Sequence, residues 1–185
     1  FGFSGSGESG GDIVTLGLNE KQDVIDACDF LRKSFEIDKY ILWGRSMGAA
    51  TTFLAAGKIN GLLGFIADSP YQSTTALFKD LAGKVKIPAF IQGPALWYVK
   101  NKVNEKLEGN ILDVSPEQEA AMLTLPIIIG HCALDSFIPY HQAQHLYDVY
   151  KGEDKTLIPL PFDHNSNRPI EWLETCFSFI CRLVG

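Results

Sequence analysis

Four short apolar segments, separated by stretches with helical periodicity, constrain the fold of this chain more than any other feature. They cover residues 40–43, 62–67, 127–129 and, more weakly, 157–160. Short apolar runs without alternation are typical of strands that are buried on both faces of a sheet. Because such strands alternate here with helical patterns, the sequence predicts an α/β fold with a mostly parallel sheet and helices on both faces.

The intervening stretches predict where the helices begin and which faces they bury. Asn19, followed three residues later by Gln22, forms a capping-box pattern that predicts a helix start. Further helices are expected over about 49–57, 140–150 and 169–184, and residues 1–3 are expected to end a strand. The apolar stripes expected to face the core are Val24, Ala27, Cys28, Leu31 and Phe35 in the first helix, and Ile170, Leu173, Phe177 and Ile180 in the last.

The segment 70–125 interrupts this alternation. It is long, irregular and rich in aromatic residues, and a connection of this length between two strands usually has structure of its own. We therefore predict a helical cap inserted into a single domain that spans 1–185; ordinary packing of helices on the sheet is the alternative. The aromatic residues concerned are Tyr71, Phe78, Phe90, Trp97 and Tyr98.

Composition excludes several classes of function. The net charge of −6 argues against nonspecific nucleic-acid binding, which needs a basic surface. No apolar run approaches the roughly 18 residues that a membrane span requires, and the start of the chain lacks the pattern of a signal peptide. The four cysteines show neither metal-ligand nor disulfide spacing, from which we infer a reducing compartment. We expect a cytoplasmic location, no metal and no cofactor.

The sequence Gly44-Arg45-Ser46-Met47-Gly48 matches the pattern G-x-S-x-G. A serine on a very tight strand-to-helix turn has a strained backbone, and side chains at the two glycine positions would clash. An apolar strand precedes the motif and a small-residue helix follows it, which is the context that such a turn requires. Ser46 is therefore the predicted nucleophile, and the backbone N–H of Met47 is the predicted oxyanion donor.

A serine nucleophile needs a base, and the base needs an acid that orients it. In this kind of fold the order along the chain is serine, acid, histidine. His164 lies between the last strand and the last helix, where the base is expected, and Asp135 follows the preceding strand. The competing histidines fit less well, because His141 and His145 are expected to be solvated on a helix and His131 precedes the acid. Among the competing acids, Asp163 is expected to point away from His164, and Asp68 belongs to an earlier loop. Glu153 and Asp154 lie at a helix end.

A second glycine-rich motif, G-x-G-x-x-G at Gly5 to Gly10, resembles a dinucleotide fingerprint. That fingerprint must open a helix directly, whereas β-branched residues and Gly17 follow here. Nucleotide binding is therefore not predicted.

Four segments together resemble the α/β-hydrolase superfamily, in particular its serine aminopeptidase-like and monoacylglycerol lipase-like branch, which is similar to protein depalmitoylases. The segments are the loop Phe3 to Ser9, the turn Gly44 to Gly48, Asp135 with Ile138-Pro139, and His164 to Pro169. Two local patterns depart from this family, which usually has His-Gly where this chain has Gly130-His131, and Gly where it has Asp163. The resemblance implies a serine hydrolase that cleaves an ester, a thioester or an amide of a small-molecule or acylated substrate through a covalent acyl-enzyme.

The same resemblance implies earlier strands and a His-Gly loop that supplies a second oxyanion donor, and neither is found in this sequence. We therefore expect an N-terminally truncated fold whose strand at 40–43 is covered by a further segment or a partner chain, since an open apolar edge favours aggregation. A non-catalytic binding protein on the same scaffold, or an inactive fragment, is the alternative. The identity of the substrate and of its binding residues is not predicted.

Overall fold

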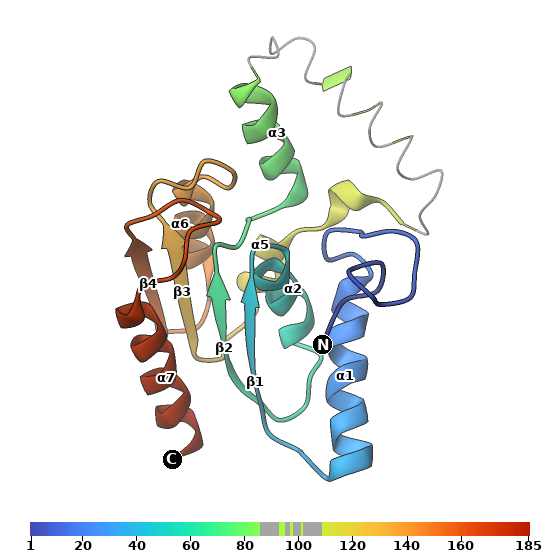
Figure 1. The fold of residues 1–185 in the computed structure, drawn as a ribbon, viewed down its shortest axis with the longest axis vertical. Helices are drawn as coiled ribbons and strands as arrows, with labels where there is room; N and C mark the ends of the chain where they lie inside the picture. Colours follow the sequence, from blue (N-terminus) through green and yellow to red (C-terminus); the bar gives the residue numbers. More distant parts are fainter. Residues whose placement is uncertain (86–92, 95–96, 98–100, 102–108) are drawn as a thin grey trace.

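The computed structural model describes residues 1–85, 93–94, 97, 101 and 109–185 (Figure 1). Its strands are β1 (Tyr40–Arg45), β2 (Leu62–Asp68), β3 (Ile127–Cys132) and β4 (Lys155–Leu160). Its helices are α1 (Glu20–Phe35), α2 (Met47–Ala56), α3 (Thr74–Lys84), the 3₁₀ helix η1 (Ile111–Asp113), α5 (Pro116–Ala120), α6 (Tyr140–Val149) and α7 (Ile170–Val184).

The four strands form one parallel sheet in the order β1-β2-β3-β4. Each apolar segment predicted from the sequence lies in one of these strands, and the predicted α/β class is confirmed. Because the strands are parallel, the loops that follow them all emerge at one edge of the sheet, toward which the four arrowheads in Figure 1 point. The residues that follow the strands are therefore brought close together, although they are far apart in the sequence.

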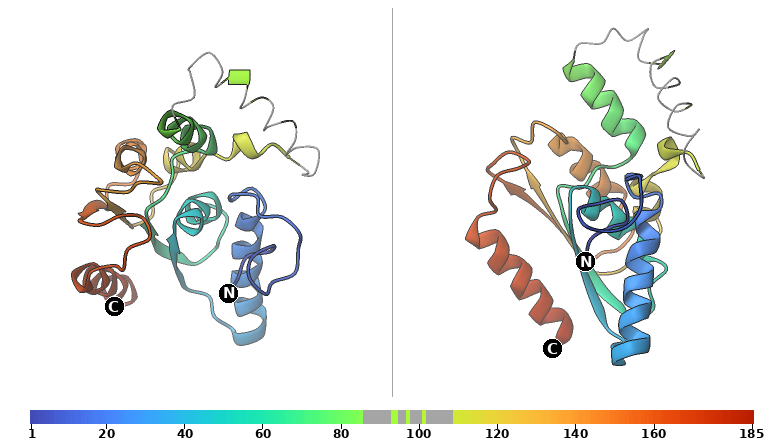
Figure 2. Two further views of the ribbon diagram at one scale, coloured as in Figure 1. Left: turned by 45° about the horizontal axis from the view of Figure 1, so that its top comes forward. Right: turned by 45° about the vertical axis from the view of Figure 1, so that its right-hand side comes forward.

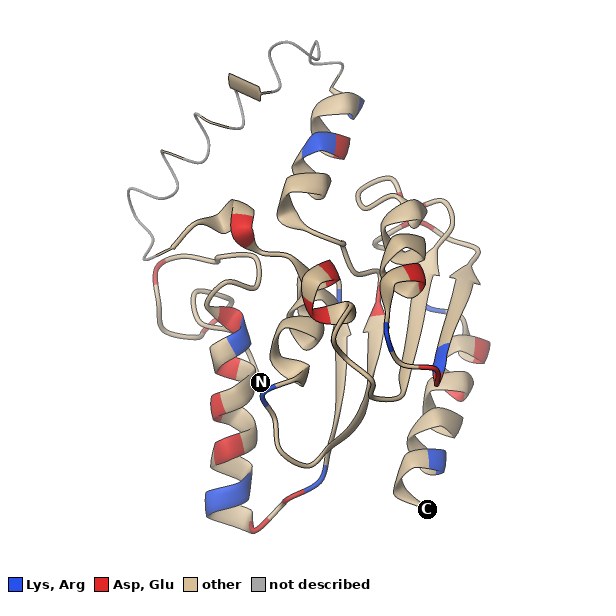
Figure 3. Cartoon of the chain, turned by 180° about the vertical axis from the view of Figure 1, so that it is seen from behind, with Lys and Arg blue, Asp and Glu red and all other residues tan. Residues whose placement is uncertain are grey.

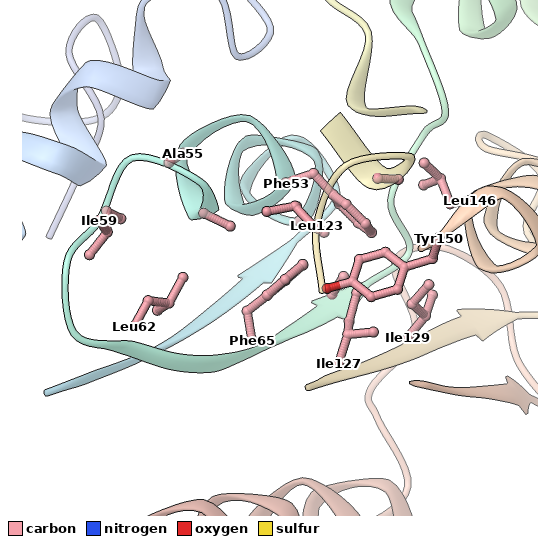
Figure 4. Close-up of a cluster of buried hydrophobic side chains, with 14 of the residues drawn as sticks. Phe53, Ala55, Ile59, Leu62, Phe65, Leu123, Ile127, Ile129, Leu146 and Tyr150 are labelled. Atoms are coloured by element: carbon pink, nitrogen blue, oxygen red, sulfur yellow. The ribbon is translucent and has the colours of Figure 1, made fainter. Parts of the chain in front are cut away.

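Helices cover both faces of the sheet, as Figure 2 shows. Helices α2 and α6 pack on one face, with α1 outside α2, and α7 packs alone on the other among the described helices. Side chains alternate accordingly: Phe65 and Ile129 point to the first face (Figure 4), whereas Ile66 and Ile128 point toward α7. This alternation is the period of two expected of a strand that is buried on both faces.

The buried face of α7 differs from the prediction. Ile170, Leu173 and Phe177 are exposed, and the buried residues are Trp172, Cys176 and Phe179. Gly130 of β3 decides this orientation, because a Cβ atom at this position would lie 2.5 Å from the indole ring of Trp172. The large ring occupies the space above the glycine, and the other apolar stripe of the helix faces outward.

Two predictions for the N-terminal segment are wrong. Residues 1–3 form no strand, and the side chain of Asn19 makes no capping hydrogen bond, because its backbone is already in the α region. The carboxylate of Glu20 instead accepts hydrogen bonds from the backbone N–H groups of Thr15 and Gly17, at 2.6 and 2.7 Å. Glu20, in the first turn of the helix, therefore accepts the hydrogen bonds of backbone N–H groups in the loop before α1.

The segment 70–125 contains α3, η1 and α5, and its centre lies outside the described residues. Helix α3 extends from the edge of the sheet where the strands end (Figure 1). Buried contacts of Tyr71, Leu77 and Val114 with α2 and Ile138 anchor the two ends of the segment. Of the aromatic residues expected to form a cap, Phe90 and Tyr98 lie outside the described residues.

Charged side chains lie mainly on the helices and loops around the sheet. Figure 3 shows acidic and basic residues interspersed along α1. Within the described part of the chain, no helix combines the length and the apolar character needed to cross a membrane.

Candidate active site

Ser46 lies at the tight connection between β1 and α2. Its backbone has φ 55° and ψ −119°, which is strained for a residue with a side chain. The connection can be this tight because Gly44 has no side chain: a Cβ atom there would lie 2.2 Å from the carbonyl oxygen of Gly48. The hydroxyl is thus raised at the carboxyl edge of the sheet, beside the first turn of α2.

The imidazole of His164 joins Ser46 to Asp135. Its Nε2 atom lies 3.0 Å from Oγ of Ser46, and its Nδ1 atom lies 2.6 Å from Oδ2 of Asp135. Ser46 follows β1, Asp135 follows β3 and His164 follows β4, so three separate loops meet at this point. The structure therefore brings together the three residues that the sequence singled out, at distances suitable for proton transfer.

Asp135 is held in a fixed orientation. Its Oδ1 atom accepts hydrogen bonds from the backbone N–H groups of Phe137 and Ile138, at 2.9 and 2.7 Å, which leaves Oδ2 for His164. Burial alone would raise the pKa of this carboxyl, but hydrogen bonds from His164, Ile138 and Phe137 outweigh burial and hold its pKa below the ordinary value. The carboxylate is therefore charged near neutral pH and accepts a hydrogen bond from Nδ1–H of His164.

His131 is fully buried beside this carboxylate. Its Nε2 atom lies 2.8 Å from the carbonyl oxygen of Ile138 and 3.6 Å from Oδ2 of Asp135. Because a carbonyl oxygen can only accept, Nε2 carries the proton. Burial lowers the pKa of this imidazole, so the ring is neutral. His131 thus supports the loop of the acid and does not reach Ser46.

The remaining histidines lie away from Ser46, on α6. His141 is 3.2 Å from Asp80 of α3, and His145 is 2.7 Å from Glu117 of α5. The side chain of His141 is 62% exposed, as the sequence predicted, whereas that of His145 is 42% exposed and only partly solvated. They connect α6 to neighbouring helices and take no part in the arrangement around Ser46.

Comparisons with solved structures show the same architecture. The chain is similar to the esterase Pf2001 of Pyrococcus furiosus, with a TM-score of 0.75 and 19% sequence identity over 99% of this chain and 69% of that chain. It is also similar to mouse alpha/beta hydrolase domain-containing protein 10, with a TM-score of 0.68 and 17% identity over 99% of this chain and 76% of that chain. A monoacylglycerol lipase of Paleococcus ferrophilus gives a TM-score of 0.62 and 21% identity over 96% of this chain and 79% of that chain. The chain has the α/β-hydrolase fold.

Sequence comparison gives a further similar protein. The uncharacterized protein YqkD of Bacillus subtilis is 27% identical over 151 residues, which are 79% of this chain and 48% of that protein. The chain therefore spans about half the length of the curated relative that it matches. No family model matches the sequence.

Within this α/β-hydrolase fold, two arginines that the sequence did not single out hold the loop of His164. Arg168 forms a buried, bidentate ion pair with Asp68 at the end of β2, with both N···O distances at 2.7 Å. Arg45, inside the G-x-S-x-G motif, donates to the carbonyl oxygens of His164 and Ser166, at 2.6 and 3.2 Å. Their partners lie about 100 residues away or more, so no local pattern could have predicted these contacts.

Asp163 points toward the loop of the acid, contrary to the expectation that it points elsewhere. Its carboxylate accepts hydrogen bonds from the backbone N–H and the hydroxyl of Ser136, at 2.6 and 2.9 Å. It also accepts one from the backbone N–H of His164, at 2.7 Å. The pKa of Asp163 is lowered mainly by the hydrogen bonds from the Ser136 and His164 amides, so the carboxylate is charged near neutral pH.

The outer edge of β1, opposite β2, lies next to Ser46. Among the described residues β1 pairs with β2 alone, and Trp43 is 47% exposed. A hollow of about 500 Å³ lies along this edge, lined by Phe1, Phe3, Leu42 and the Ser46 turn. The backbone N–H of Met47, in the first turn of α2, has no acceptor within the helix and lies next to Ser46.

Proposed function

We propose that this protein is a serine hydrolase that cleaves an ester, a thioester or an amide through a covalent acyl-enzyme on Ser46. The observation that carries the proposal is the continuous hydrogen-bonded chain from Ser46 through His164 to Asp135 at the carboxyl edge of the sheet. Support for a hydrolase also comes from the similar structures, which are named an esterase and a monoacylglycerol lipase.

In the proposed first step, Oγ of Ser46 attacks the carbonyl carbon of the substrate and its proton passes to Nε2 of His164. The negative charge that develops on the carbonyl oxygen is stabilised by the N–H of Met47 and by the partial positive charge at the start of α2. Collapse of this intermediate breaks the bond to the alcohol, thiol or amine, which takes the proton from Nε2. Asp135 stabilises the positive imidazole throughout and does not itself become protonated.

In the second step, water attacks the acyl group on Ser46 and gives its proton to Nε2. The tetrahedral intermediate collapses, the carboxylic acid leaves, and the proton returns to Oγ. The turn at Ser46 thereby acts as a nucleophile elbow, because its strained backbone presents Oγ above the sheet edge without rearrangement.

The test is labelling of the full chain with a fluorophosphonate probe. We expect a stoichiometric adduct on Ser46, identified by peptide mapping, and its complete loss in Ser46→Ala. The matched control is Ser34→Ala, which removes an exposed hydroxyl from α1 and should leave labelling unchanged. A folded protein that shows no adduct on Ser46 would contradict the proposal.

A non-catalytic role on the same scaffold is the second candidate, and the open edge of β1 favours it. A second oxyanion donor is expected on that side of Ser46, and the loss of one donor typically costs about 10²–10³ in rate. We propose that a further segment or a partner chain adds a strand to β1 there and completes the site. If so, labelling becomes faster when that strand is present, whereas a binding protein would remain unlabelled in its presence.

The remaining parts of the proposal concern the surroundings of the site. The single domain spans 1–185, and its segment 70–125 acts as a cap above the sheet edge, because α3 rises from that edge (Figure 1). We place the protein in the cytoplasm, since all four cysteines are free and Cys28, Cys132 and Cys176 are buried as thiols.

A further inference from the structure

We infer that Asp163 is a positioning residue that locks the loop of the base to the loop of the acid. This inference rests on the proposed function and deepens it, since it concerns how His164 and Asp135 are held together. Among the described residues, the contact between Asp163 and Ser136 joins the two loops directly beside the His164–Asp135 hydrogen bond.

The geometry of the carboxylate suits this role. Its Oδ1 atom accepts from two backbone N–H groups at once, that of Ser136 in the loop of the acid and that of His164 itself. Its Oδ2 atom accepts from the Ser136 hydroxyl. Since Ser136 follows Asp135 and Asp163 precedes His164, the contact lies one residue away from both members of the proton relay.

This contact restrains the relay on its solvent-exposed side. Asp135 and His164 are buried, whereas Asp163 and Ser136 are exposed. The opposite side of the His164 loop is held by Arg45 through two carbonyl oxygens. Without Asp163, the loop would keep its attachments to Arg45 and Arg168 but would lose its direct tie to Ser136, and the imidazole could rotate away from Ser46 while the core stayed intact.

Hydrogen-bonding capacity, and not charge alone, is what the position requires. In Asp163→Asn, the amide oxygen can still accept from both backbone N–H groups, and the amide nitrogen can donate to the Ser136 hydroxyl. In Asp163→Ala all three bonds are lost. The conservative variant should therefore retain function where the truncated one does not.

The experiment compares Asp163→Ala, Asp163→Asn and the control Asp148→Ala in the full chain. Asp148 is also exposed and also accepts one side-chain hydrogen bond, from Gln144, but it lies on α6. We expect Asp163→Ala to lower the rate of fluorophosphonate labelling and the kcat for a p-nitrophenyl ester by about 10- to 100-fold, as a small misplacement of a catalytic group does. KM and thermal unfolding should change little, and the Asn and control variants should stay within about threefold of the wild type.

A proton NMR signature tests the same contact independently of turnover. The Nδ1 proton of His164, in its 2.6 Å bond to Asp135, should give a far-downfield resonance in the wild type. We expect this resonance to broaden or vanish in Asp163→Ala and to persist in Asp163→Asn and the control. If Asp163→Ala keeps both the resonance and the labelling rate, the inference is overturned and the proposed hydrolase stands. If no variant is labelled but the resonance follows this pattern, the positioning role stands and the hydrolase fails.

Discussion

The substitution Asp135→Asn tests the proton relay with almost no change in shape. Asn has the same size as Asp, and its side-chain oxygen can replace Oδ1 as the acceptor for the N–H groups of Phe137 and Ile138. These two bonds fix which end of the amide faces inward. The NH₂ group then takes the place of Oδ2 and points at Nδ1 of His164, 2.6 Å away in the wild type.

A donor in this position reverses the tautomer of the imidazole. Nδ1 must become the acceptor, so the proton moves to Nε2, which then faces Oγ of Ser46 as a donor. In this state His164 cannot remove the proton from Ser46. The loss expected for this change in a serine hydrolase is about 10⁴ in kcat, equivalent to about 5.4 kcal/mol of transition-state stabilisation.

The assay is the second-order rate of fluorophosphonate labelling, together with kcat and KM for an activated ester under steady-state conditions. We expect KM to change little, because Asp135 lies behind the imidazole and is buried from substrate. The matched control is Asp148→Asn, an isosteric change at an exposed residue of α6. If Asp135→Asn keeps labelling within tenfold of the wild type, another group orients His164 and the relay is wrong.

Three further outcomes follow from the geometry. Arg168→Met should destabilise the fold by about 3–5 kcal/mol in urea unfolding, because it leaves the Asp68 carboxylate buried and unpaired; adding Asp68→Asn should recover most of the loss. Gly44→Ala should abolish labelling, because its Cβ would clash with backbone, whereas Gly83→Ala, with open space around it in α3, should raise stability by up to about 1 kcal/mol. Folding lowers the pKa of Asp135, so the charged carboxylate should stabilise the fold above the ordinary pKa of 3.8. This stabilisation should be lost as the pH falls through the lowered pKa. The difference in unfolding midpoint between the wild type and Asp135→Asn should therefore shrink in acid.

The sequence predicted the strands, and it singled out the three residues that meet at Ser46, because both depend on local patterns. The strand segments are continuous apolar runs. Ser46, Asp135 and His164 could be singled out because each lies in the loop directly after one of these runs. It failed for α7, where the choice between two apolar stripes was made by Gly130, 42 residues earlier in the chain than Trp172. Long-range packing of this kind leaves no periodic signal in the helix itself.

The supports of the site were missed for a related reason. Asp163 was judged by its neighbour His164, yet its partner is Ser136 in a different loop. Arg168 lies within the segment His164 to Pro169, in which the sequence assigned no role to this arginine, although it is paired with a carboxylate 100 positions earlier. Charged residues can be placed only after the topology is known, because their partners come from strands that are adjacent in space and distant in sequence.

These supports explain how four strands can hold a complete relay. The loops after β1, β3 and β4 supply Ser46, Asp135 and His164, and the last residue of β2 is Asp68, which fixes Arg168 beside the base. Every connection at this edge therefore contributes either to the relay or to its support, and none of these contacts uses the outer edge of β1. In the proposed mechanism, assembly of the relay and completion of the oxyanion site are therefore separable: a strand added along β1 would change how well the transition state is stabilised, while the positions of Ser46, His164 and Asp135 are already set without it.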